Sequence, residues 1–120
     1  MSENPPLDLQ VIDALRELSP DSGADFLREL VEIYLQDTPE RLTELDQALV
    51  RQDAAVVTRA AHSIKGSSSN FGAKHLAQLA QVIEAQGKLS NLTAAAAAVA
   101  DLKVEYARVA QALSQIAAGT

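Results

Sequence analysis

The stretch LTAAAAAVADLKVEYARVAQALSQI, from Leu92 to Ile116, is the most regular part of the chain. Its apolar residues alternate spacings of three and four, a pattern typical of the seam of a helical bundle. The seam residues are Leu92, Ala95, Val99, Leu102, Tyr106, Val109, Leu113 and Ile116. The run from Ala94 to Ala98 looks like low complexity. Because alanine has the highest helix propensity, we expect instead a slim helix face that allows close packing.

Three further segments show helical spacing of their apolar residues. The sequence predicts a long helix from about 24 to 49, a helix from about 53 to 71 capped by Asp53, and a helix from about 73 to 86. Gly72 and Gly87 are expected to end the last two, Gly72 in a left-handed conformation. Pro39 either kinks the long helix or starts a second one, since proline removes a hydrogen bond and crowds the preceding turn. We favour the kinked helix.

The N-terminal part is expected to be a flexible leader over residues 1–6 and a short helix from Leu7 to Leu18, followed by a break over residues 19–23. No segment alternates as a β-strand does, so the fold is predicted to be all-α. Four main helices with short connections predict an up-and-down antiparallel four-helix bundle, over about 23–117, with a short additional N-terminal helix. The 120 residues are the size of one domain, so we predict a single domain over 1–120.

Composition excludes several classes of protein. Ten basic and 16 acidic residues give a net charge of −6, which argues against a nucleic-acid binder. There is no cysteine, which excludes disulfides, thiol nucleophiles and cysteine-bound zinc. No apolar stretch approaches the roughly 20 residues that span a bilayer, and the N-terminus lacks the pattern of a signal peptide. We therefore predict no membrane association and a cytoplasmic location.

The residues suited to catalysis are few. The two histidines, His62 and His75, fall on different predicted helices and do not form a helical metal-binding pair. Gly66, Gly72 and Gly87 are isolated, so no glycine-rich phosphate loop is present. Nothing in the spacing supports a hydrolase, because no nucleophile, base and oxyanion site can be assembled from it. A metal site has no support from the sequence either.

The segment AAHSIKGSSSNFG, from Ala60 to Gly72, contains the most informative histidine. A turn of about 100° per residue places an apolar stripe opposite His62, made of Val57, Ala60, Ile64 and Phe71. Lys65, Gly66 and Ser69 fall within about 60° of His62, on the same outward, solvated face. His62 is therefore expected to be exposed, either as an ordinary surface histidine or as a reactive one.

The neighbours of His62 favour the reactive alternative. Gly66 followed by three serines is a poor choice for a helix interior, since glycine costs about 1 kcal/mol relative to alanine. A missing side chain one turn from an imidazole leaves room for a bulky group, and Lys65 offers a mobile cation for an anion held there. Neutral imidazole is nucleophilic near pH 7. These features suit a phosphoryl group on His62, although Gly66 could instead allow close helix packing.

At these residues the chain resembles the histidine-containing phosphotransfer (HPt) domain family. The motif consists of residues 61–68 (AHSIKGSS), then Phe71-Gly72-Ala73, then Leu76, Leu79 and the pair Ile83-Glu84. The number of helices, the preceding long helix and the chain length are similar as well. The resemblance thus covers most of the chain, apart from the generic N-terminal helix.

The resemblance implies a phosphorelay intermediate in two-component signal transduction. His62 would accept a phosphoryl group from an aspartyl phosphate on one receiver domain and pass it to an aspartate on another. The family's lysine and glycine map onto Lys65 and Gly66, and its hydroxyl or amide neighbour onto Ser69. The implied partners are receiver domains of response regulators or hybrid histidine kinases. These would supply Mg²⁺, so this chain would bind no cofactor and have no ATP-dependent kinase activity of its own.

Several points stay open at this stage. The stripe Val11, Leu15 and Leu18 on the first helix either docks the receiver or packs in the core. We predict a monomer; whether the chain is free-standing or excised from a larger kinase is undecided, with Met1 and the polar leader favouring a free-standing protein. The alternative function is a non-catalytic helical-bundle adaptor in which His62 is incidental.

Overall fold

The computed structural model describes residues 5–18 and 23–119, and every regular element in these ranges is an α-helix. Residues 1–4 of the predicted leader and most of the predicted break lie outside the described residues. The elements are α1 (Leu9–Glu17), α2 (Gly23–Arg51), α3 (Ala54–Ser69), α4 (Lys74–Lys88) and α5 (Leu92–Ala118). None of the described helices is long and apolar enough to cross a membrane.

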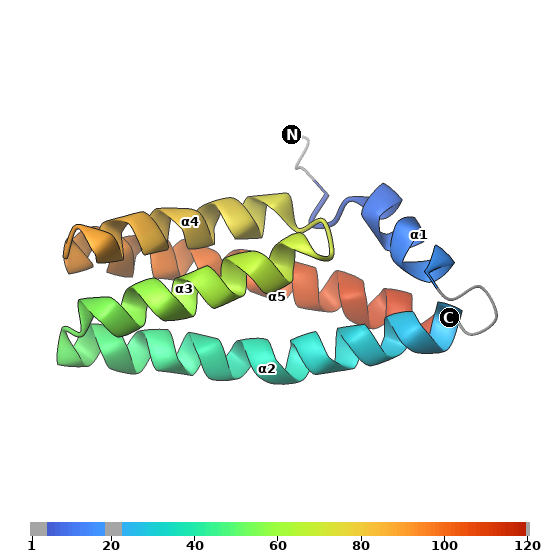
Figure 1. Ribbon diagram of the computed structural model, residues 1–120, viewed down its shortest axis with the longest axis horizontal. Coiled ribbons are helices and arrows are strands. Elements are labelled where there is room, and N and C mark those ends of the chain that lie inside the picture. Colours follow the sequence, from blue (N-terminus) through green and yellow to red (C-terminus); the bar gives the residue numbers. More distant parts are fainter. Residues whose placement is uncertain (1–4, 19–22, 120) are drawn as a thin grey trace.

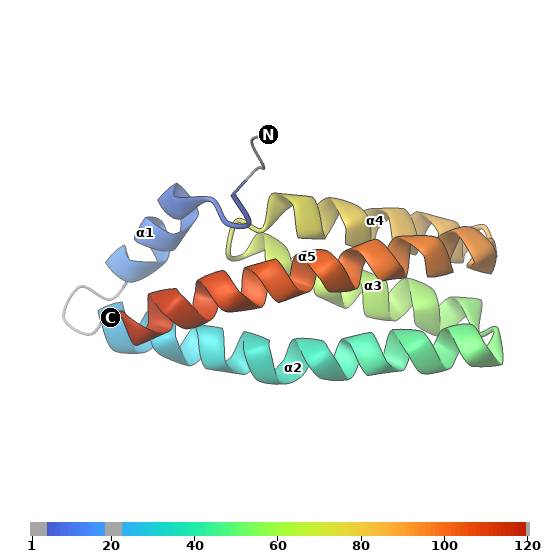
Figure 2. The same cartoon turned by 180° about the vertical axis from the view of Figure 1, so that it is seen from behind.

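Helices α2 to α5 form an up-and-down antiparallel bundle (Figure 1). Each helix packs on the next one, and α5 closes the ring by packing against α2 as well as α4. The shorter α1 packs against α2 at one end, where the C-terminal end of α5 also lies (Figure 2). The predicted all-α bundle with an additional N-terminal helix is confirmed, and the whole measures 47 × 32 × 18 Å.

The core follows the apolar periodicity of the sequence. In α5 the predicted seam residues are buried or half-buried, and Ala95 and Ala98 from the alanine run face inward. In α3 the predicted stripe is buried, with Val57, Ala60, Ile64 and Phe71 each at most 5% exposed. The core is therefore built mainly of small and branched aliphatic side chains and contains few aromatic rings. This agrees with the composition of the sequence, in which only 3% of the residues are aromatic.

Helix α2 runs without interruption through Pro39, so the alternative of two separate helices is wrong. Pro39 is exposed, so its missing N–H and its ring lie on the outer face of the helix, where solvent can compensate. The Thr43 hydroxyl donates to the Pro39 carbonyl over 3.1 Å. Helix α2 is therefore one continuous helix that runs along the length of the bundle (Figure 1).

The turn between α3 and α4 anchors the N-terminal segment. Gly72 has the predicted left-handed conformation, with φ +69°, although α3 ends at Ser69, before the predicted Phe71. The Gly72 carbonyl accepts from the Asp8 N–H over 3.0 Å, and the Asp8 carboxylate caps α1 by accepting from the Gln10 N–H. Because Asp8 is taken up by this cap, α1 begins at Leu9 and not at Leu7 as predicted.

Gly87 does not end α4, contrary to the sequence prediction; the helix continues to Lys88. Gly87 is buried and faces Thr58 of α3, where an added Cβ would lie 2.5 Å from Thr58 Oγ1 and 3.2 Å from the Thr58 nitrogen. The absent side chain therefore lets α3 and α4 approach closely. Sequence reasoning could not separate this role from helix termination, because both use an isolated glycine.

Gly87→Ala is expected to destabilise the bundle by about 1–2 kcal/mol. The clash involves backbone atoms of Thr58, so the two helices must move apart, at a cost of about 1–3 kcal/mol. The higher helix propensity of alanine returns at most about 1 kcal/mol. Thermal melts measure the difference, and Gly66→Ala is the matched control because it makes the same change on an open helix face. An unchanged or raised stability of Gly87→Ala would contradict the close contact.

Candidate functional site

Three side chains from two helices meet on one face of the bundle. Nδ1 of His62 lies 2.9 Å from Oε2 of Glu84, and Nζ of Lys65 lies 2.6 Å from Oε1 of the same carboxylate. His62 and Lys65 stand one turn apart on α3, and Glu84 comes from α4. The carboxylate of Glu84 therefore joins the two predicted site residues across the helix pair.

The three groups differ sharply in exposure. The side chain of His62 is 67% exposed, as predicted, whereas that of Glu84 is only 9% exposed. Lys65 is half-buried at 28%, so the prediction of a freely solvated lysine was wrong. It was wrong because the ammonium folds onto Glu84 rather than extending into solvent. The buried carboxylate of Glu84 is thus hydrogen-bonded to the exposed imidazole of His62.

The protonation states of this cluster follow from its charges. The hydrogen bond from Lys65, followed by that from His62, holds the pKa of Glu84 below its usual range, although burial opposes this shift. An ionised carboxylate can only accept, so Nδ1 of His62 carries the proton of that hydrogen bond. In the neutral imidazole the other nitrogen, Nε2, then has a free lone pair. The geometry presents a nucleophilic nitrogen on an exposed side chain.

Gly66 faces open space. An added Cβ would meet no atom within 4 Å, apart from the neighbouring backbone of its own helix. The alternative in which Gly66 allows close helix packing is therefore excluded, and that role belongs to Gly87. The cleared surface lies one turn from His62, on the exposed side of α3.

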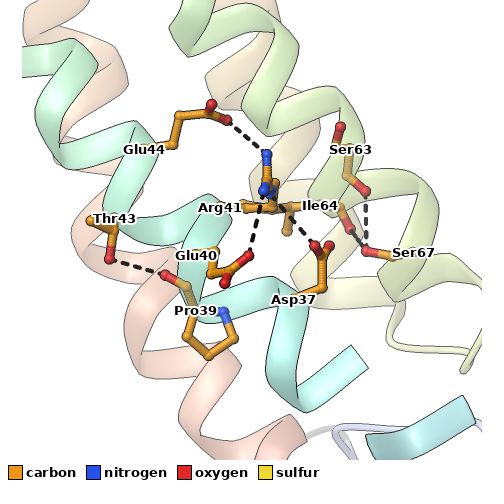
Figure 3. Close-up of polar contacts among 9 residues, drawn as sticks. All are labelled: Asp37, Pro39, Glu40, Arg41, Thr43, Glu44, Ser63, Ile64 and Ser67. Atoms are coloured by element: carbon orange, nitrogen blue, oxygen red, sulfur yellow. Dashed lines mark hydrogen bonds and ion pairs between the residues drawn. The ribbon is translucent and has the colours of Figure 1, made fainter. Parts of the chain in front are cut away.

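The serines after Gly66 bond to the protein itself and not to the imidazole. Ser69 Oγ donates to the Lys65 carbonyl over 2.8 Å. Ser67 Oγ donates to the Ser63 and Ile64 carbonyls, as Figure 3 shows. Ser68 is buried and hydrogen-bonded to the Tyr34 hydroxyl over 2.8 Å. Burial raises the pKa of Tyr34 to about 12. A supporting role for Ser69 in chemistry stays a prediction.

The side of α2 that lies beside α3 carries an acidic cluster around one arginine (Figure 3). The guanidinium of Arg41 lies 3.2 Å from Glu44, 3.7 Å from Glu40 and 3.8 Å from Asp37. All four residues belong to α2. The one guanidinium pairs with all three carboxylates within that helix, and none of these pairs involves His62, Lys65 or Glu84, so we assign this cluster no part in the site.

The second histidine stands apart from this cluster. His75 is exposed near the start of α4 and lines a separate hollow with Asp8, Gly72 and Lys74. The ammonium of neighbouring Lys74 is paired with Asp8 over 3.1 Å. Among the described residues, no carboxylate is hydrogen-bonded to His75 as Glu84 is to His62.

The apolar stripe on α1 divides between the two alternatives. Val11 and Leu15 are half-buried, Leu18 is 66% exposed, and the fully buried residue of this helix is Ile12. Leu15 borders an apolar hollow of about 330 Å³ between α1, α2 and the end of α3. The stripe thus packs partly on the bundle and leaves Leu18 at the surface.

Glu84 is the functional residue that sequence reasoning missed. It appears in the motif of the resemblance, but no role follows for it from the spacing within α3. The available signal is its position: it follows Ile83 and lies four residues after Ala80, on the buried side of α4. A carboxylate among core positions requires a partner, because an unpaired buried charge is strongly unfavourable.

Lys65→Ala is expected to lower the free energy of unfolding by about 1–2 kcal/mol at neutral pH, since it removes a charge-assisted hydrogen bond from a buried carboxylate. The pKa of Glu84 is lowered on folding, so this stabilisation is present above its unfolded value of 4.5 and is lost as the pH falls through the folded-state value. The thermal stabilities of Lys65→Ala and of the parent protein should therefore become equal at acidic pH.

Lys103→Ala provides the matched control for this measurement. Lys103 Nζ lies 2.6 Å from Asp46 Oδ2, the same distance as in the Lys65–Glu84 pair, but both side chains are nearly half exposed. Exposed ion pairs contribute about 0–1 kcal/mol. Equal losses for the two variants would contradict a special role for the shielded carboxylate.

Residues 29–119 match the family model described as the Hpt domain. The chain belongs to the Hpt domain family. Among the described residues of this Hpt domain, no group of three or more His, Asp or Glu side chains could hold a metal ion.

Individual relatives agree with this assignment. Histidine-containing phosphotransfer protein 1 of Arabidopsis thaliana is 30% identical over 102 residues, which cover 83% of this chain and 66% of the relative. Pseudo histidine-containing phosphotransfer protein 2 of Oryza sativa subsp. japonica is 27% identical over 101 residues, or 82% and 67% of the two chains. This Hpt domain thus spans about two thirds of the length of these relatives.

The fold is also that of a solved phosphotransfer protein. The crystal structure of histidine-containing phosphotransfer protein B (HptB) from Pseudomonas aeruginosa PAO1 superposes with a TM-score of 0.89 at 31% identity. The match covers 98% of this chain and 99% of that one, so it extends over the bundle and the N-terminal helix.

Proposed function

We propose that this Hpt domain is a phosphorelay intermediate in two-component signal transduction, and that Nε2 of His62 carries the phosphoryl group between aspartates of receiver domains. The single observation that carries the assignment to His62 is the hydrogen bond between its Nδ1 and the shielded carboxylate of Glu84. Family membership supports the relay role in general. Because one relative is named a pseudo phosphotransfer protein, the fold alone does not decide the activity of a given chain.

In the proposed step, the lone pair of His62 Nε2 attacks the phosphorus of an aspartyl phosphate. The N–P bond forms while the P–O bond to the aspartate breaks, and the carboxylate leaves with the bonding electrons. No proton has to be removed from Nε2, since the imidazole proton is on Nδ1. The ring gains positive charge as the bond forms, and the Glu84 carboxylate on Nδ1 stabilises it. Transfer to the second receiver domain is the reverse reaction.

Lys65 and Gly66 are assigned supporting roles in this proposal. Lys65 keeps Glu84 ionised and lies one turn from the phosphoryl position, where its charge favours a bound anion. Gly66 leaves the surface beside the imidazole free for the phosphoryl group and the approaching receiver domain. Mg²⁺ is assigned to the receiver domain, so the proposal asks this chain to bind no metal.

The remaining parts of the proposal concern the whole protein. We propose a cytoplasmic monomer that acts on receiver domains of response regulators or hybrid histidine kinases and has no kinase activity with ATP. The net charge of −6 supports protein partners over nucleic acid.

The decisive experiment is incubation with receiver domains carrying a labelled aspartyl phosphate. We expect the label to appear on this chain as an acid-labile, alkali-stable bond, which is the behaviour of a phosphoramidate and not of a phosphoester. No label from any of several receiver domains would favour the adaptor alternative, in which His62 is incidental.

A further inference from the structure

Besides Lys65, the surface around His62 carries another basic residue, which the proposed function does not use. Arg59 is three residues before His62 on α3 and is exposed. Residues at this spacing are neighbours on a helix surface, with Cβ atoms about 5–6 Å apart. Among the ion pairs of the described residues, none involves Arg59, whereas Lys65 is held by Glu84.

The register of α3 and α4 brings a third cation, Lys88, to the same face as Lys65 and Arg59. Gly87 contacts Thr58, so the residues that follow them, Lys88 and Arg59, stand at the same level of the helix pair. Each turns about 100° from the contact, and in antiparallel helices these turns point to the same side. That side is the one on which His62 and Glu84 meet. Lys88 is 64% exposed, with Nζ 3.6 Å from Glu84 Oε2.

The side chains around His62 are mostly positively charged, whereas the chain as a whole is negatively charged. Arg59, Lys65 and Lys88 share this face with one carboxylate, Glu84, so the formal charges around His62 sum to two positive charges in a chain of net charge −6. Like charges side by side disfavour the folded protein unless an anion joins them. The arrangement is therefore suited to a dianion.

The direction of the imidazole selects Arg59 among these cations. Side chains on a helix lean toward its N-terminus, so His62 leans over the turn that holds Arg59. Nδ1 faces Glu84, so a group on Nε2 extends away from that carboxylate. Lys65 and Lys88 are drawn to Glu84, and Arg59 is the one whose donors are uncommitted. A guanidinium can donate to two phosphoryl oxygens at once.

We infer that Arg59, assisted by Lys88, forms an anion site that holds the phosphoryl group once it is on His62, an inference that rests on the proposed function. Arg59 is a positioning residue in this account: it binds the transferred group and leaves the nucleophile unchanged. The pair of cations favours the dianionic phosphoryl group over the monoanion. Loss of Arg59 should therefore make the phosphoryl group easier to protonate.

The test uses chemical phosphorylation of the full chain with phosphoramidate, which needs no receiver domain. The N–P bond to His62 forms as the P–N bond of the reagent breaks and ammonia leaves. A His75→Gln background removes the second exposed histidine. The ³¹P chemical shift of the phosphohistidine is then followed against pH, in the parent and in Arg59→Gln. We expect its midpoint to rise by about 0.7 pH units in the variant, the value for one charge at about 4–5 Å in water.

Two matched variants make this result specific. Arg51→Gln removes an exposed arginine at the end of α2 and should leave the midpoint unchanged. Arg59→Lys keeps the charge and should restore most of the parent midpoint. An Arg59→Gln midpoint equal to that of the parent overturns the inference and leaves His62 as the acceptor. Absence of any phosphohistidine signal in the parent, or its persistence in His62→Gln, overturns the inference together with the proposed function.

Discussion

His62→Gln is expected to abolish phosphoryl transfer from a receiver domain while leaving the bundle folded. Glutamine has no nucleophilic nitrogen, so the N–P bond cannot form. The side chain is 67% exposed, and its amide can still donate to Glu84, so the free energy of unfolding should change by less than about 0.5 kcal/mol. Transfer of label from a phosphorylated receiver domain and thermal melts measure the two effects on the same protein sample.

His75→Gln is the control for this variant. His75 is also exposed, but it lines a hollow with Lys74 and Asp8 at the start of α4, and no carboxylate of the described residues is hydrogen-bonded to it. We expect it to accept label at the rate of the parent protein. If His62→Gln still took label and His75→Gln did not, the assignment of the acceptor would be wrong, although family membership would stand.

The bundle could be predicted because its core positions repeat within single helices. The stripe of Val57, Ala60, Ile64 and Phe71 follows from the turn of about 100° per residue, and all four are buried. The same periodicity places His62 on the opposite face. Local periodicity therefore determines which side of α3 is exposed without any knowledge of the neighbouring helix.

The residues that the sequence did not place all depend on how two helices meet. Glu84 reaches His62 and Lys65 only through the register of α4 against α3, which no spacing within either helix contains. For the same reason Lys65 was expected in solvent, and Gly87 at the end of a helix rather than against Thr58. Each error concerns a contact between residues about 20 to 30 positions apart in sequence.

The two helical glycines illustrate this difference. Gly66 and Gly87 are both isolated glycines inside helices. From the sequence, close packing stayed open for Gly66, whereas Gly87 was predicted to end its helix. In the structure an added Cβ meets Thr58 at Gly87 and nothing within 4 Å at Gly66. Packing within the bundle does not explain Gly66, although glycine lowers the helix propensity there. The absence of a side chain at this position therefore indicates a requirement of binding or transfer and not of folding.

Gly66→Gln is therefore expected to separate folding from transfer. Glutamine is a good helix former, and the position is open, so the free energy of unfolding should stay equal or rise by up to about 1 kcal/mol. Its side chain would occupy the space one turn from the imidazole, where the phosphoryl group and the receiver domain have to fit. We expect transfer to slow by roughly ten- to a hundredfold, because small misplacements of reacting groups have effects of that size.

Gly66→Ala identifies the cause of that slowing. Alanine gives the helix the same gain in propensity with only one added carbon, so it should stabilise the bundle and transfer nearly as fast as the parent. Equal slowing in both variants would mean that a stiffer helix, and not the occupied space, impairs transfer. A Gly66→Gln protein that melted lower but transferred normally would place the glycine in packing after all. With thermal melts and transfer rates on these two variants, each explanation gives a different pair of results.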